Sequence, residues 1–129
     1  MDEINNVLEE RGSNYGNFHT FSNLSQTLYA VIVKHYNDIN KQRGVEAQLP
    51  SFMAESLRMI CHKVARIANG NPYHLDSWVD IAGYSQLVAQ IIEEHTAAAQ
   101  IKAEVEDMKA AKASVTTLTQ PQSAVEEGE

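Results

Sequence analysis

The stretch "ARIANGNPYHLDSWVDIAGYSQL", residues 65–87, joins two segments whose apolar residues recur at helical spacing. Asn69, Gly70 and Pro72 between them are residues that typically end one helix before another begins. A link this short places consecutive helices side by side and in opposite directions. The stretch therefore predicts an antiparallel helical hairpin at the centre of an all-α bundle.

Four charged side chains should gather at the closed end of this hairpin. Lys63 and Arg66 lie three apart on the first helix, and Asp76 and Asp80 lie four apart on the second. Because residues three or four apart share a helix face, we expect Arg66 near one of the aspartates, with Lys63 one turn further along. Two interpretations are open: a salt-bridge network that locks the hairpin, or a site where the bases hold phosphate oxygens.

Each aspartate has a structural and a functional explanation. Asp76 precedes Ser77 at a helix start, where a carboxylate caps the helix or suits its dipole. Asp80 would be satisfied by an ion pair with Lys63 or Arg66. In the functional interpretation Asp76 and Asp80 hold Mg²⁺, which prefers oxygen ligands and keeps waters for a phosphate.

Residues outside the hairpin add candidates to this site. Glu55, earlier on the first helix, is the candidate third metal ligand. Arg11 and Tyr15 belong to the glycine-rich stretch "ERGSNYGNF", residues 10–18, where a tyrosine can stack on a base and an arginine can hold a phosphate. Alternatively, Tyr15 plugs the end of the bundle. Tyr84, next to Gly83, is a further candidate for ligand contact.

The remaining patterns complete the predicted architecture. Helices are expected over 2–11, 20–40, 51–69 and from about residue 74 beyond 93, with Gly12 as a stop, a loop over 12–18 and Ser51 as a cap. We expect a helical-bundle domain over 1–95, a helical extension over 96–113 and a disordered acidic tail over 114–129. The segment 78–92 is too apolar to face water, which predicts a homo-oligomer, dimer or tetramer.

Composition excludes several classes of protein. A formal net charge of −7 argues against a nucleic-acid partner, because phosphate backbones need a basic surface. No apolar run approaches the ~20 residues of a membrane span, and the polar N-terminal residues are unlike a signal peptide. We therefore expect a cytoplasmic protein without membrane contact. The single cysteine, Cys61, excludes an intrachain disulfide and predicts a buried free thiol.

Three stretches resemble a known family: residues 10–18, "ESLRMICHKVARIANGNP" at 55–72 and "HLDSWVDIAGYSQL" at 74–87. The family consists of small phage and prophage proteins whose domain has no known function (DUF6378-like), and the resemblance covers about residues 8–92. It implies the cytoplasm of a host cell if the protein is phage-encoded. The most specific part is Lys-x-x-Arg followed by Asp-Ser-Trp-x-Asp-Ile-Ala-Gly-Tyr.

That segment is in turn distantly similar to the all-α nucleoside triphosphate pyrophosphohydrolases, the MazG-like and dimeric dUTPase-like group. The resemblance implies that Asp76 and Asp80 form the second carboxylate pair around magnesium and that Lys63 and Arg66 face the phosphates. The chain departs from the group's pattern, because a Glu-Glu-x-x-Glu cluster is reduced to Glu55. The carboxylate set is therefore incomplete.

The expected function is recognition of a nucleotide or another phosphate-bearing ligand, with or without magnesium-dependent pyrophosphate cleavage. In the catalytic version Asp76 and Asp80 hold the metal while Lys63 and Arg66 neutralise the phosphates. The alternatives are a non-catalytic protein that sequesters a host nucleotide signal or inhibits a host protein, and a structural interaction module.

Overall fold

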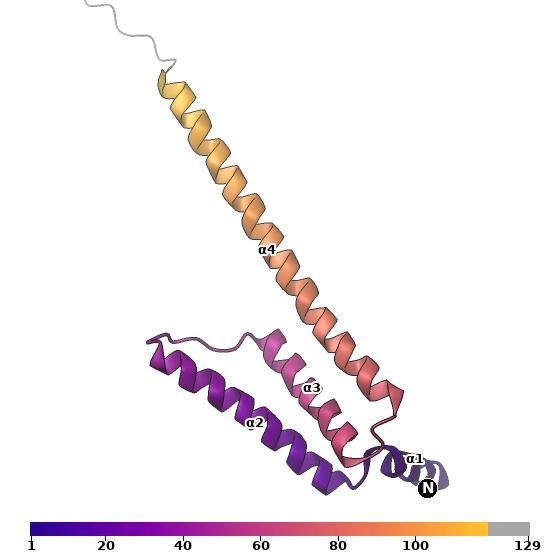
Figure 1. Cartoon of the computed structure of the whole chain (residues 1–129). Coiled ribbons are helices and arrows are strands. Elements are labelled where there is room, and N and C mark those ends of the chain that lie inside the picture. The colour runs from indigo at the N-terminus through magenta and orange to yellow at the C-terminus, as the bar shows by residue number, and fades with distance from the viewer. Residues whose placement is uncertain (119–129) are drawn as a thin grey trace, which may run out of the picture. The chain divides into compact units, whose positions relative to one another are not determined.

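A computed structural model describes residues 1–118, and all its regular elements are helices (Figure 1). They are α1 (Asp2–Tyr15), α2 (Phe18–Gln42), α3 (Ser51–Asn69) and α4 (Leu75–Leu118). No strand occurs over these residues, so the all-α prediction is confirmed. The chain divides into two compact units, Met1–Gln90 and the residues from Ile91 onward.

The end of α1 differs from the sequence-based prediction. Gly12 lies inside the helix, which runs on to Tyr15 and ends at Gly16, whose φ is 76°. The predicted loop over residues 12–18 is therefore wrong, and a two-residue link replaces it. Gly16 ends the helix because glycine adopts positive φ without a steric penalty. Asn17 then caps α2 by accepting the Thr20 backbone N–H at 3.2 Å.

The start of α3 also needs a correction. Ser51 is the first helical residue, and Pro50 precedes it with no side-chain hydrogen bond to the helix end. The prediction of Ser51 as a cap is wrong. Proline is compatible with this place because its fixed φ favours an extended residue just before a helix.

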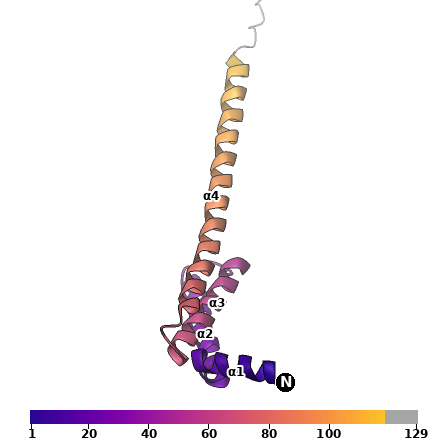
Figure 2. The same ribbon diagram turned by 90° about the vertical axis from the view of Figure 1, so that its right-hand side faces the viewer.

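Helix α3 contacts the other three helices in the first unit. Helices α2 and α3 lie side by side (Figures 1 and 2). Phe21 of α2 contacts His62 of α3 edge-on, with ring centroids 4.7 Å apart. Towards α4, the Ser56 hydroxyl donates to the Tyr84 carbonyl oxygen at 2.9 Å. Lys63, later on α3, contacts Asp80, earlier on α4.

The core of the first unit is small. Its buried apolar residues are Phe21, Cys61 and Ala65, which confirms the buried thiol. Ser56 and Ser77 are also buried, and such small side chains let neighbouring helices approach closely. Trp78, by contrast, is 53% exposed in the single chain.

The second unit continues α4. Every described side chain from Ile92 to Val115 is exposed. Helix α4 is described as far as Leu118, so residues 114–118 of the predicted tail are helical, and residues 119–129 lie outside the described part. Over residues 1–118, no helix combines the length and apolar character that crossing a bilayer requires.

Candidate functional site

A cavity of about 480 Å³ lies where α1, the beginning of α2 and the second half of α3 meet. We call it the α1 pocket. Its lining residues are Leu8, Arg11, Gly12, Tyr15, Gly16, Asn17, Phe18, Phe21, His62 and Arg66. Three predicted ligand-binding residues, Arg11, Tyr15 and Arg66, are therefore brought to one cavity. They come from two helices that are distant in sequence.

Arg66 is held in this pocket by aromatic rings. Its guanidinium carbon lies 4.1 Å from the centroid of the Tyr15 ring and 5.8 Å from that of Phe21. Rings attract a cation over their faces through their quadrupole, which fixes the guanidinium without an ion pair. The Nε atom of Arg66 is buried and has no hydrogen-bond partner in the structure. A buried N–H without an acceptor is costly, by about 1–3 kcal/mol.

His62 adds a titratable group to the same wall. Burial lowers the pKa of His62 below its ordinary value, and the nearby charges of Arg66, Lys63 and Arg58 lower it further. The imidazole is therefore neutral at pH 7 and offers one donor and one acceptor. His62 was not among the residues predicted for the site. Its spacing of four residues from Arg66, which puts both on one helix face, was the available signal.

On its other side Tyr15 contacts His74, the residue before α4. Its hydroxyl lies 3.2 Å from His74 Nε2, and the two rings meet edge-on with centroids 5.3 Å apart. His74 in turn lies 3.7 Å from an Asp76 carboxylate oxygen. Asp76 is 79% exposed and occupies the first turn of α4, which agrees with its structural interpretation. It lines a second cavity of about 250 Å³ that shares Arg11 and Tyr15 with the α1 pocket.

Asp80 is paired with a buried base. Its carboxylate lies 2.9 Å from Lys63 Nζ, with the Lys63 side chain 11% exposed and that of Asp80 44% exposed. This is the ion pair that the structural interpretation of Asp80 predicted. Arg66 does not join it. The expected cluster of four charges is divided, because Lys63 faces α4 while Arg66, almost one turn later, faces α1.

The predicted metal ligands have separate surroundings. Glu55 is exposed and pairs with Arg58 on its own helix at 3.2 Å, while Asp76 and Asp80 contact His74 and Lys63. Over residues 1–118, no three histidine, cysteine or acidic side chains come together to hold an ion. This arrangement does not fit a magnesium ion held by three carboxylates, and the magnesium site stays a prediction.

Tyr84 and a further cavity lie apart from the α1 pocket. Tyr84 is not among the pocket's lining residues, and its carbonyl oxygen accepts a hydrogen bond from the Ser56 hydroxyl.

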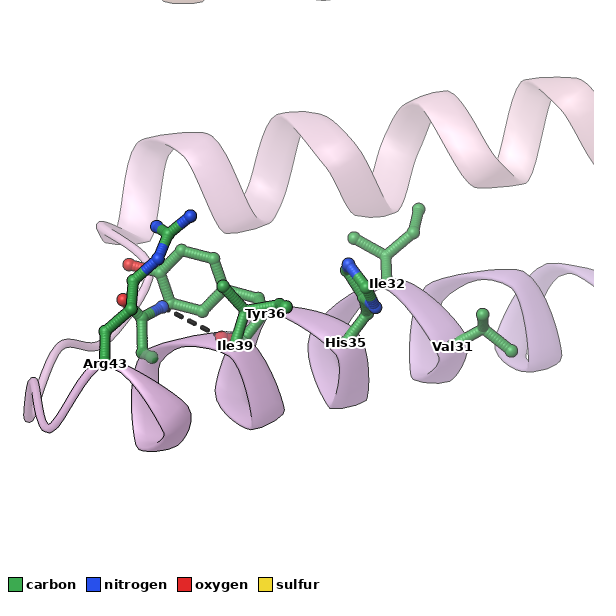
Figure 3. Close-up of a pocket in the computed structure, with 7 residues that line it drawn as sticks. Val31, Ile32, His35, Tyr36, Ile39 and Arg43 are labelled. Carbon is green, nitrogen blue, oxygen red and sulfur yellow. Dashed lines mark hydrogen bonds between the residues drawn. The ribbon is translucent and has the colours of Figure 1, made fainter.

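A cavity of about 500 Å³ lies along the second half of α2 (Figure 3). It is lined by Val31, Ile32, His35, Tyr36, Ile39, Asn40 and Arg43. None of the predicted site residues belongs to it.

A comparison with protein families places most of the chain in a family. A family described as "Domain of unknown function (DUF6378)" matches residues 1–92. The chain belongs to this family. No curated protein and no solved structure matches the chain. The DUF6378 region nearly coincides with the first unit, Met1–Gln90, and contains the α1 pocket and every predicted site residue.

Proposed function

We propose that the α1 pocket binds a ligand that combines a phosphate group with an aromatic ring, and that this ligand is a nucleotide. The observation that supports the proposal is the composition of one cavity wall. Arg11, Arg66 and His62 line it together with the aromatic residues Tyr15 and Phe18. A guanidinium group can donate two parallel hydrogen bonds to the oxygens of one phosphate, and exposed aromatic rings stack on bases.

The charges around the pocket favour binding without a metal. The residues that line it include no carboxylate, so the arginines would neutralise the phosphate directly. Of the two aspartates that the cleavage mechanism requires, Asp80 is paired with Lys63, and Asp76 is exposed outside the α1 pocket. We therefore propose a non-catalytic nucleotide-binding protein rather than a magnesium-dependent pyrophosphohydrolase. A phage protein that sequesters a nucleotide in the host cytoplasm would match this chemistry.

The proposal includes an assembly. The order of contacts along α2, α3 and α4 agrees with antiparallel hairpins. Trp78, Val79 and Leu87 on α4 are each more than half exposed in the single chain. Large apolar side chains gain free energy when they leave water. We propose that a homo-oligomer covers them.

Calorimetry and thermal unfolding of the full chain test the binding proposal. The titrants are ATP, AMP, adenosine and inorganic phosphate, each with magnesium and with a chelator. We expect the nucleotides to bind in both conditions and to raise the unfolding free energy by about 2.7 kcal/mol at 100 times their Kd. Arg66→Gln and Arg11→Gln should each weaken binding at least tenfold, since a charged hydrogen bond contributes about 1.5–3 kcal/mol.

Arg43→Gln is the matched control, because Arg43 follows α2 outside the α1 pocket. It should leave the affinity unchanged. Failure of all four titrants to bind would contradict the proposal. Magnesium-dependent release of pyrophosphate from ATP would instead support the enzymatic interpretation.

A further inference from the structure

The second unit has a regular stripe along its helix. Ile91, Glu94, Ala98, Ile101, Val105, Met108, Lys112 and Val115 follow one another at alternating steps of three and four residues. We call these eight residues the core stripe. Ile91 is partly exposed, and the other large apolar members are exposed in the single chain, with Ile101 at 61%, Met108 at 70% and Val115 at 59%. Steps of three and four are the heptad spacing of a coiled-coil seam.

We propose that the core stripe binds the core stripe of a second copy in an antiparallel two-stranded coiled coil. A two-fold axis between Ile101 and Val105 makes the stripe complementary to itself. Ile101 then faces Val105 of the second copy, and Ile91 faces Val115 of the second copy. The same surface serves both chains, which is the geometry of an isologous dimer. This inference is independent of the nucleotide proposal, because it uses only the second unit.

Charge complementarity selects the antiparallel orientation. In this register Glu94 faces Lys112 of the second copy, and the pair occurs twice because of the symmetry. A parallel coil would place Glu94 against Glu94 and Lys112 against Lys112 in the seam. Like charges in a poorly hydrated seam repel strongly, whereas a matched pair offsets part of its desolvation cost.

Side-chain size supports the same register. Ala98 faces Met108 of the second copy, so each small side chain meets a large one. A parallel coil would set Ala98 against Ala98 and leave a gap in the seam. Cores pack to native density when large and small residues alternate across the interface.

The charged residues beside the seam favour the parallel orientation, but they contribute less free energy than the seam residues. A parallel coil would bring Glu104 near Lys109 of the second copy, while the antiparallel coil brings two Lys102 side chains near its axis. Such flanking positions stay in water, where salt and solvent screen the interaction. The seam residues therefore decide the orientation.

Cysteine cross-linking of the full chain reads the register directly. Ala98→Cys and Met108→Cys chains are prepared separately, mixed and oxidised. We expect disulfide-linked dimers in the mixture and few in either variant alone, because position 98 faces position 108. The wild type, whose Cys61 is buried, is the control. Dimers within Ala98→Cys alone, or no cross-linking in the mixture, would overturn the proposal.

A charge exchange tests the same register without oxidation. Glu94→Lys should raise the dimer dissociation constant at least tenfold in sedimentation equilibrium, because a positive charge at position 94 would face Lys112 of the second copy. Adding Lys112→Glu should restore the affinity. Glu93→Lys makes the same charge change outside the stripe and should have little effect. Equal losses for the two lysine variants, or no recovery in the double variant, would contradict the antiparallel register.

Discussion

Lys63 and Arg66, both on α3, contact two different helices. They lie three residues apart, yet Lys63 reaches Asp80 on α4 while Arg66 stacks on Tyr15 of α1. A buried ammonium is costly unless a counter-charge and hydrogen bonds compensate for its lost hydration. Asp80 supplies that counter-charge. Arg66 tolerates an aromatic setting because guanidinium is more weakly hydrated than ammonium.

Asp80→Asn should therefore lower stability and spare ligand binding. We expect a loss of about 1–3 kcal/mol, less than the roughly 3–5 kcal/mol for breaking a fully buried pair, because Asp80 is 44% exposed. Urea unfolding measures the loss, and Lys63→Met combined with Asp80→Leu should recover most of it. If Asp80→Asn abolished nucleotide binding at unchanged stability, a direct role of this carboxylate at the ligand would be indicated.

At the scale of elements, the end of α1 and the end of α3 interlock and build the pocket wall. The Asn69 side-chain amide donates to the Tyr15 carbonyl oxygen at 2.9 Å. The Asn71 backbone N–H donates to the Asn14 carbonyl oxygen at 2.6 Å. A β-carbon on Gly16 would lie 2.2 Å from the Asn69 carbonyl oxygen. Gly16 therefore provides both the positive φ and the space that this contact needs.

Alanine substitutions at two glycines should have opposite effects. Gly16→Ala combines a left-handed backbone with a backbone clash, so we expect it to destabilise the protein by more than about 1–2 kcal/mol. Gly12→Ala should stabilise it by about 0.5–1 kcal/mol, because Gly12 is helical and has open space at its β-position. Thermal unfolding compares the two. A larger loss of stability in Gly12→Ala than in Gly16→Ala would indicate that α1 ends at Gly12, as the sequence pattern predicted.

At the scale of the whole molecule, few of the apolar side chains are buried in the single chain. Phe21, Cys61 and Ala65 are the buried apolar residues of the described chain, whereas many large apolar side chains are exposed. Small domains bury a lower fraction of their surface than large domains do. The exposed residues occur in both units, for example Trp78 in the first and Met108 in the second.

Stability should consequently depend on protein concentration. If folding is linked to association, mass action raises the Tm as the chain becomes more concentrated. We expect the Tm, measured by circular dichroism, to rise by several degrees when the chain concentration increases from micromolar to about a hundred micromolar. Glu94→Lys should reduce this dependence, and Glu93→Lys should preserve it. A Tm independent of concentration, together with a monomeric mass, would show that the single chain is self-sufficient.

Local patterns predicted much of the fold. Apolar spacing located the main part of each helix, and the Asn-Gly-Asn-Pro link indicated that the end of α3 and the start of α4 would be neighbours, as the Lys63–Asp80 pair shows. These features depend on residues close in sequence, whose relative positions helix geometry fixes. The boundaries were less accurate. Gly12 and Gly16 look alike in sequence, and their backbone conformations distinguish them.

The composition and order of residues by themselves determined an all-helical chain with its charges near one turn. The tertiary structure decided which charges meet. Asn69 contacts Tyr15 across a separation of 54 residues, and this contact accompanies the stacking of Arg66 on Tyr15 away from the aspartates. The physical reason is that a helix fixes which side chains share a face, whereas packing between distant segments selects the neighbour that each face receives.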